Sequence, residues 1–140
     1  MPSDLSLLAS QVRLTCQRIS RRVRFEGTHE VAPHQFSVMA RLADGGDSTP
    51  TQLAEIERVS TPSITRTLNC LQESGIVTRT PHPTDGRQVT VSLTDEGRAI
   101  VQRTRAQRDS WMAERLATLD ADQLDVVQQA IEILAEVASR

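Results

Sequence analysis

The chain has 140 residues, enough for one domain that buries a core without disulfides or metals. Hydrophobic residues make up 38% and no window approaches the length of about 18 apolar residues that a membrane span needs, while residues 1–4 lack the start of a secretory signal. With a net charge of −2, two Cys and three scattered His, we expect a cytoplasmic protein that is mainly α-helical and has no cofactor, metal site or membrane contact.

The small net charge conceals an uneven distribution. All 16 basic residues are Arg, the side chain best suited to phosphate and to groove insertion. The stretch 58–90 has four Arg against two acidic residues, a net charge of +2, whereas residues 112–140 have six acidic residues against two Arg, a net charge of −4. The near-neutral total therefore does not exclude a basic face.

The N-terminal half shows a helical period. Apolar residues spaced by 3 and 4 predict a first helix over about residues 4–26. Pro33 suits the first turn of a second helix that runs to about Ala43, and residues 44–47 form a turn. The first-helix stripe consists of Leu5, Leu8, Val12, Cys16, Ile19 and Val23.

Two short helices follow closely. Thr49 and Gln52 make a capping box around Pro50, which predicts a helix to about residue 58 with Leu53 and Ile56 facing inward. The next helix is predicted to begin with Thr61 as N-cap and Pro62 at its first position, and to stop at Gly75.

The period then changes to two. Residues 76–80 and 89–93 predict two strands joined by a hairpin loop over 81–86. Thr94 is placed to cap a long helix to about residue 119, and Asp120 with Gln123 makes a second capping box before a last helix. That last helix has two apolar stripes, so we predict that it packs on its own core and on a second subunit.

Two short helices followed by a β-hairpin predict a winged helix-turn-helix, whose second helix enters the major groove of DNA. With Ile64, Leu68 and Leu71 inward, that helix presents an outer face without an acidic residue before Glu73. Hydroxyl, amide and Arg groups on this face suit phosphates and base edges. The outer face consists of Pro62, Thr65, Arg66 and Asn69, flanked by Ser63 and Cys70.

These residues resemble the MarR-type transcriptional regulators. Asp85, Gly86 and Arg87, followed by Val91, Leu93, Thr94 and Gly97, fit the family's wing pattern D-x-R-x-x-x-V-x-L-T-x-x-G. The upstream positions from Leu53 to Val77 also fit, and the strong similarity covers about residues 31–97.

The resemblance implies a homodimer that binds double-stranded DNA at a palindromic operator, as a repressor that a small molecule releases. Residues 31–97 would form the DNA-binding lobe of the single domain 1–140, and residues 4–27 and 98–138 the dimerisation helices. Arg87 would enter the minor groove, with Asp85 fixing the wing loop. The predicted DNA-binding residues are Thr61, Pro62, Ser63, Thr65, Arg66, Asn69, Arg79, Asp85 and Arg87.

The family binds effectors in a cleft between its dimer helices and its DNA-binding lobe. Trp111 would line such a cleft, and Arg18 is the candidate partner of a small aromatic or anionic effector. The competing interpretations are packing of the Trp, and intersubunit salt bridges or solvation of the Arg.

Other readings stay open at this point. A winged-helix adaptor that binds protein instead of DNA is the runner-up, and a thiol-based redox regulator is the third. Cys16, on the apolar stripe, is predicted to be a buried structural residue, and Cys70 to be a bystander beside the recognition face. The sequence contains no nucleophile elbow, phosphate loop or paired-carboxylate motif, so we predict that the protein is not an enzyme.

Overall fold

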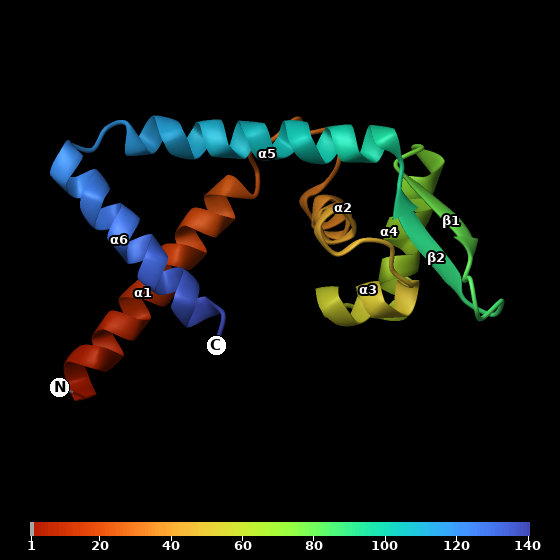
Figure 1. Cartoon of the computed structure of the whole chain (residues 1–140), viewed down its shortest axis with the longest axis horizontal. Helices are drawn as coiled ribbons and strands as arrows, with labels where there is room; N and C mark the ends of the chain where they lie inside the picture. The colour runs from red at the N-terminus through yellow and green to blue at the C-terminus, as the bar shows by residue number, and fades with distance from the viewer. Residues whose placement is uncertain (1) are drawn as a thin grey trace.

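The computed structural model describes residues 2–140, with side chains from Asp4 onward, so Met1 of the predicted domain 1–140 lies outside the described residues. Six helices and a two-stranded sheet follow one another in the predicted order (Figure 1). The elements are α1 (Pro2–Val23), α2 (Pro33–Gly45), α3 (Pro50–Glu57), α4 (Thr61–Glu73), β1 (Val77–Pro81), β2 (Val89–Leu93), α5 (Asp95–Leu116) and α6 (Ala121–Ala138).

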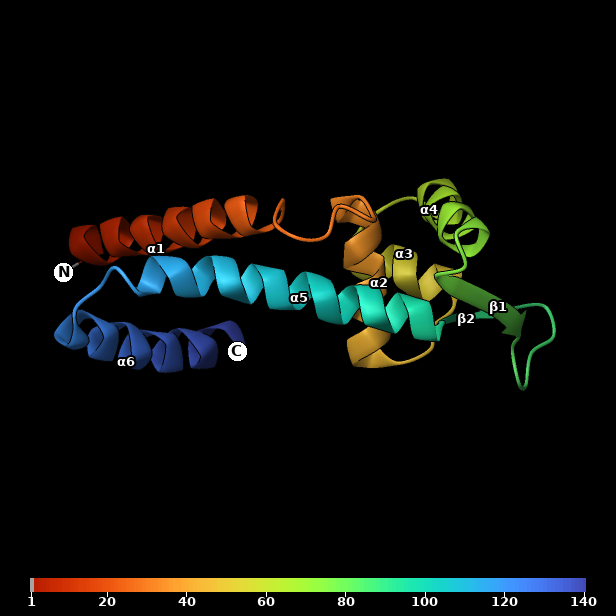
Figure 2. The same ribbon diagram turned by 90° about the horizontal axis from the view of Figure 1, so that it is seen from above.

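The molecule has two parts joined by α5. The winged lobe, residues 33–93, gathers α2, α3, α4 and the hairpin at one end of the molecule (Figure 1). Helix α5 runs from this lobe to the opposite end, where α1 and α6 lie on two sides of it (Figure 2). The N-terminal and C-terminal helices therefore stand apart from the lobe that carries the hairpin.

The hydrophobic core belongs to the winged lobe and the first half of α5. Met39, Leu53 and Leu68 are fully buried, and Ile100 and Val101 of α5 close the core from above. Among the described side chains, α1 and α6 contribute no buried residue. The lobe is thus a packed unit, while the terminal helices have apolar faces that the protomer leaves uncovered.

The hairpin is antiparallel, with Val77 opposite Leu93 and Pro81 opposite Val89. Ser48, in the loop before α3, forms an isolated antiparallel bridge with β2. Its amide donates to the Val91 carbonyl at 3.2 Å, and the Val91 amide donates to the Ser48 carbonyl at 2.7 Å. This bridge fixes the sheet against the helix-turn-helix, so the wing is part of the lobe.

Both predicted capping boxes are confirmed, at Thr49–Gln52 and Asp120–Gln123. The predicted start of the fourth helix is wrong by one residue, because Ser60 is the N-cap and its hydroxyl accepts from the Ser63 amide at 3.3 Å. Thr61 and Pro62 therefore occupy the first two helical positions.

Two helices end earlier than predicted. Helix α1 ends at Val23 and not at residue 26, and α5 ends at Leu116 and not at residue 119. In both cases backbone hydrogen bonds of single turns follow the last helical residue.

Ile56 does not face inward as predicted: its side chain is 48% exposed. The inward position of α3 belongs instead to Glu57, whose carboxylate accepts from the Ser37 hydroxyl at 2.7 Å and pairs with Arg41 at 3.3 Å. Two polar partners on α2 stabilise this half-buried carboxylate, so α3 is rotated relative to its apolar pattern.

The prediction that Cys16 is buried is wrong for the protomer, where the residue is exposed. Its neighbours on the same stripe, including Leu8 and Ile19, are also exposed, at 54% and 42%. Val12 and Val23 are half-buried, but the rest of the stripe is exposed within the protomer, so the apolar pattern did not lead to burial there.

Candidate DNA interface

Helix α4 divides into a buried face and an exposed face as its sequence predicts. Ile64, Leu68 and Leu71 are at most 1% exposed. The four predicted outer residues, Pro62, Thr65, Arg66 and Asn69, are all exposed, and Ser63 on the flank is half-buried. Thr67 joins the buried face, where its hydroxyl donates to the Ser63 carbonyl at 3.2 Å.

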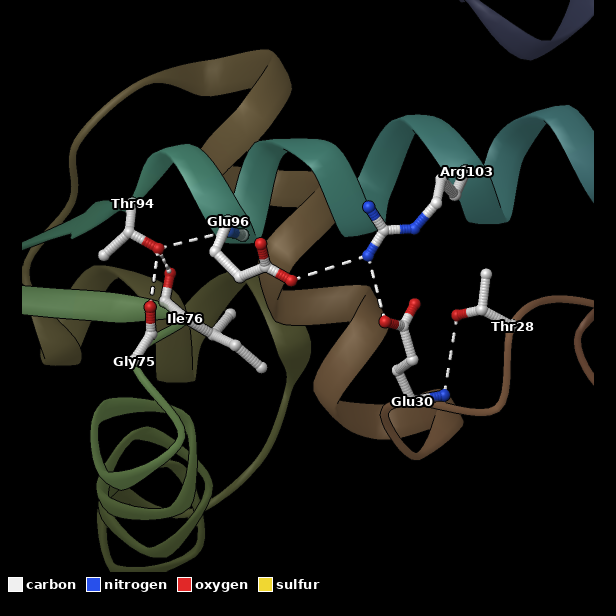
Figure 3. Close-up of polar contacts among 8 residues, drawn as sticks. Thr28, Glu30, Gly75, Ile76, Thr94, Glu96 and Arg103 are labelled. Atoms are coloured by element: carbon white, nitrogen blue, oxygen red, sulfur yellow. Dashed lines mark hydrogen bonds and ion pairs between the residues drawn. The ribbon is translucent and has the colours of Figure 1, made fainter.

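The C-terminal end of α4 is joined directly to the wing and to α5. Gly75 has φ +74°, which lets the Ile76 amide donate back to the Leu71 carbonyl at 2.9 Å. The Thr94 hydroxyl lies 2.7 Å from the Gly75 carbonyl and 3.0 Å from that of Ile76, and it accepts from the Gly97 amide at 3.1 Å (Figure 3). One side chain therefore links the recognition helix, the hairpin and the start of α5.

Gly97 is required at this junction. A Cβ there would lie 2.5 Å from the Ile76 carbonyl oxygen, a distance that backbone atoms cannot accommodate without moving. The close approach of α5 to the start of the wing explains the glycine in the wing pattern.

The wing loop is organised by two side chains that accept backbone hydrogen bonds. Oδ1 of Asp85 accepts from the Arg87 amide at 3.1 Å. Nδ1 of His82 accepts from the amides of Asp85 and Thr84, at 3.1 and 3.3 Å. This holds the loop closed and leaves Arg87 exposed at its tip.

Sequence reasoning did not assign a role to His82. The signal was present, since a His between two prolines at the start of a hairpin loop is close enough to reach the next amides. Its acceptor role requires an unprotonated Nδ1.

The structure brings together two of the predicted site residues that lie on different elements. Nη2 of Arg79, on β1, donates to Oδ1 of Asn69, on α4, at 2.7 Å. Thr65 lies one helical turn before Asn69, and its hydroxyl donates to the Thr61 carbonyl at 2.9 Å. No hydrogen bond joins the side chain of Thr61, Thr65 or Arg66 to those of the Asn69–Arg79 pair in the described structure.

A cleft of about 600 Å³ lies where α1, α2, α3 and α5 meet, between the terminal helices and the winged lobe. Arg108 lines this cleft. Its guanidinium lies 4.2 Å from the Phe36 ring centre and donates to the carbonyls of Glu26 and Arg24, both at 3.0 Å. Burial, followed by the charges of Arg24 and Arg105, lowers the pKa of Arg108.

Trp111 and Arg18 do not line this cleft. Trp111 lies further along α5, with its ring centre 3.5 Å from the Arg115 guanidinium and 5.5 Å from that of Arg22. Arg18 is exposed on α1. Their assignment to an effector stays a prediction.

Two ion pairs hold α5 to the segments around α2. Arg103 contacts Glu30 at 2.9 Å and Glu96 at 3.5 Å (Figure 3), and Arg105 contacts Asp44 at 2.8 Å. Hydrogen bonds from Thr28 and then Arg103 lower the pKa of Glu30, and the hydrogen bond from Arg105 lowers that of Asp44. The Arg105–Asp44 pair and the Arg108–Phe36 contact tie α5 to the winged lobe, while Arg103 and the hydrogen bonds of Arg108 tie α5 to the segment before α2.

The lobe geometry defines a winged helix-turn-helix protein: two helices in tight succession, an exposed polar recognition face and a hairpin beside it. Residues 31–89 match the family model for the MarR family. An uncharacterized HTH-type transcriptional regulator of Mycobacterium bovis is 42% identical over 128 residues, which covers 91% of this chain and 90% of the relative. The chain belongs to the MarR family, whose members are transcriptional regulators and not enzymes.

Solved structures agree with this assignment. A putative transcriptional regulator of Pseudomonas aeruginosa superposes with a TM-score of 0.83 at 29% identity, covering 100% of this chain and 99% of that one. A mutant of Escherichia coli MarR in complex with operator DNA has the same fold, with a TM-score of 0.63 at 24% identity over 94% of this chain and 95% of that one. No helix in the described part of the chain combines the length and apolarity needed to cross a membrane.

Proposed function

We propose that the protein is a homodimeric repressor that binds a palindromic operator and leaves it when a small ligand binds. The observation that carries the proposal is the placement of an acid-free polar helix face and an exposed wing-tip Arg on one rigid lobe. Within the lobe, 31–97, we assign base and phosphate contacts to Thr61, Pro62, Ser63, Thr65, Arg66 and Asn69 of α4, and minor-groove insertion to Arg87.

The terminal helices support the homodimer. Val126, Ile131 and Ile133 of α6 are 64%, 57% and 63% exposed, and Leu5 of α1 is 68% exposed. Apolar faces of this extent on two helices mark a protein interface. A second copy of the chain, pairing through residues 4–27 and 98–138, covers these faces and places two winged lobes on one duplex.

The operator follows from that symmetry. Two recognition helices on one face of a duplex require half-sites about one helical turn, roughly 10 bp, apart. Selection of bound duplexes from a random pool by the purified protein tests this directly. An enriched imperfect palindrome whose affinity falls steeply with salt is the expected result. A protein that enriches no sequence, or whose binding does not depend on salt, is instead the interaction adaptor.

For the ligand, we propose the cleft beside Arg108. It combines an aromatic ring, Phe36, with the cationic side chains of Arg24 and Arg108. The two carboxylates that also line it, Asp44 and Glu57, are each paired with an Arg, so the cleft suits a small aromatic carboxylate. The cleft also lies between α5 and α2, so a bound ligand would compete with the contacts that join these two helices, such as that between Arg108 and Phe36. Benzoate added to the protein–operator complex is the first probe, with release of DNA as the expected result.

Arg24→Ala provides the matched variant. Only the backbone carbonyl of Arg24 bonds to Arg108, so the substitution removes a cation from the cleft without breaking that contact. The variant should bind the operator like the wild type and require more benzoate for release. An unchanged benzoate response places the effector elsewhere, with Trp111 and Arg18 next to be tested.

A further inference from the structure

Asn69 and Arg79 form a side-chain pair across the junction of α4 and the wing. The 2.7 Å hydrogen bond runs from Nη2 of Arg79 to Oδ1 of Asn69, while Asn69 itself is exposed on the outer face of the helix. The two residues are ten positions apart and lie on different elements. The orientation of the Asn69 side chain, and so the groups that it can contact, therefore depends in part on β1.

Arg79 is not placed like an arginine that reaches for phosphate. The residue is half-buried, and its Nε is buried without a hydrogen-bond partner in the described structure. An Arg that extends into solvent keeps its guanidinium hydrated, whereas this one has given up water at Nε and directs a terminal nitrogen at the neighbouring helix. Its geometry serves Asn69.

The chemistry of the pair fixes the orientation of the Asn69 amide. Arg has only donors, so the oxygen of the carboxamide must face it. The Nδ2 group then carries the two free donors of Asn69, while Arg79 takes one of the two lone pairs of Oδ1. Paired recognition of adenine by Asn needs one donor and one acceptor from the same amide, directed at N7 and N6 of the base.

We propose that Arg79 is a positioning residue that holds the Asn69 carboxamide with its Nδ2 donors free for the major groove and occupies one of the two lone pairs of Oδ1. Asn69 then favours base edges with acceptors, such as N7 and O6 of guanine or O4 of thymine, over the paired contact to adenine. The inference rests on the proposed function, and it replaces the direct DNA contact predicted for Arg79 with an effect on sequence preference.

Arg79→Ala and Asn69→Ala separate these roles. Both variants and the double variant are used to select bound duplexes, and their operator affinities are measured over a range of salt. If Arg79 acts through Asn69, both single variants lose about five- to tenfold discrimination at the same base pair of each half-site. The double variant then loses little more than either one.

Arg98→Ala is the charge-matched control, because Arg98 is exposed at the start of α5 and has no ion pair in the described chain. Like Arg79→Ala it removes one cation, so it reports the general cost of lost charge. Arg79 as a phosphate contact predicts a different result: affinity falls equally for all duplexes, and the salt slope decreases by about 1. That result overturns the proposal.

Asn69→Asp tests the donor requirement. The carboxylate keeps an acceptor for Arg79, so the melting temperature should be at least that of the wild type. Its loss of donors and its negative charge should reduce operator affinity more than tenfold. An Asn69→Asp variant that binds the operator normally overturns the donor role.

A DNA-free measurement keeps this inference separate from the proposed function. The side-chain amide resonance of Asn69, assigned with Asn69→Ala, should shift in Arg79→Ala and stay in place in Arg98→Ala. An unshifted resonance in Arg79→Ala overturns the pairing whether or not DNA binds. Wild-type protein that binds no duplex while the resonance shifts overturns the proposed function and the base preference together.

Discussion

The carboxylate of Asp85 bonds to the backbone of Arg87 and not to its side chain. Oδ1 lies 3.1 Å from the Arg87 amide nitrogen, and no ion pair joins the two side chains in the described chain. The acidic residue thus closes the turn while the guanidinium stays exposed. A negative charge next to a groove-inserted Arg opposes DNA binding. We therefore infer that Asp85 contributes as a hydrogen-bond acceptor for the loop and not through its charge.

The first prediction follows from that distinction. Asp85→Asn keeps an oxygen that accepts from the Arg87 amide and removes the charge, so operator affinity should equal or exceed that of the wild type. Asp85→Ala loses the acceptor and should weaken binding severalfold through a looser loop. Fluorescence anisotropy with labelled operator measures both. Equal loss in the Asn and Ala variants would assign the role to the charge.

The second prediction concerns Arg87 itself. Arg87→Ala should leave the melting temperature nearly unchanged, since the exposed side chain has no partner in the described structure. Operator affinity should fall more than about tenfold, because a minor-groove Arg supplies charge and shape recognition. Arg87→Lys should recover only part of the loss, since an ammonium is more strongly hydrated. Unchanged affinity in Arg87→Ala would remove the wing from the interface.

Local sequence signals predicted the winged lobe well. The capping box at Thr49 and the stop at Gly75 each depend on neighbouring residues, and the structure confirms them. The change of period predicted the hairpin, although its first strand spans Val77–Pro81, one residue later than the predicted 76–80. The family resemblance then added the wing tip. These features are local because caps, turns and strand alternation are decided within a few residues.

The contacts that sequence reasoning missed join distant segments. Arg108 binds carbonyls more than 80 positions away, and Asn69 meets Arg79 only once the hairpin folds back on α4. No spacing rule reports such pairs, because they depend on how whole elements pack. Ile56 shows the same limit, since a polar network around Glu57 decided which face of α3 turned inward.

The third prediction addresses base reading by α4. Arg66 is exposed in the middle of the recognition face and is free to extend toward DNA. Arg66→Ala should reduce discrimination between the operator and a singly mutated operator by about 1–3 kcal/mol at one base pair. Competition binding with a panel of single-substitution duplexes measures this. An equal loss for every duplex would make Arg66 a phosphate contact.

The fourth prediction concerns the terminal helices. Ile133→Asp places a charge on the exposed apolar face of α6, where the side chain is 63% exposed in the protomer. If a second copy covers this face, the charge must be buried, and the dimer should dissociate at micromolar concentration. Analytical ultracentrifugation of the wild type and variant measures the mass. Gln128→Asp, at an exposed position that faces away from Ile133 around the helix, is the control, and a wild-type monomer would contradict the proposal.

The last prediction concerns acid sensitivity of the contacts between α5 and the segments around α2. Hydrogen bonds from Thr28 and Arg103 lower the pKa of Glu30 below its ordinary 4.5, and the bond from Arg105 lowers that of Asp44 below 3.8. Because the folded state lowers both values, these carboxylates stabilise it above their ordinary pKa. That stabilisation is lost as the pH falls through the lowered values.

The double variant Glu30→Gln and Asp44→Asn should therefore be slightly less stable than the wild type at pH 7. The difference should shrink as the pH falls below about 4, where the wild-type carboxyls become protonated. Urea midpoints at several pH values measure the gap, which should be small because both pairs are exposed. Glu55→Gln, an exposed carboxyl without an ion pair in the described chain, is the matched control. A gap that stays constant with pH would show that the two ion pairs do not hold α5 to the segments around α2.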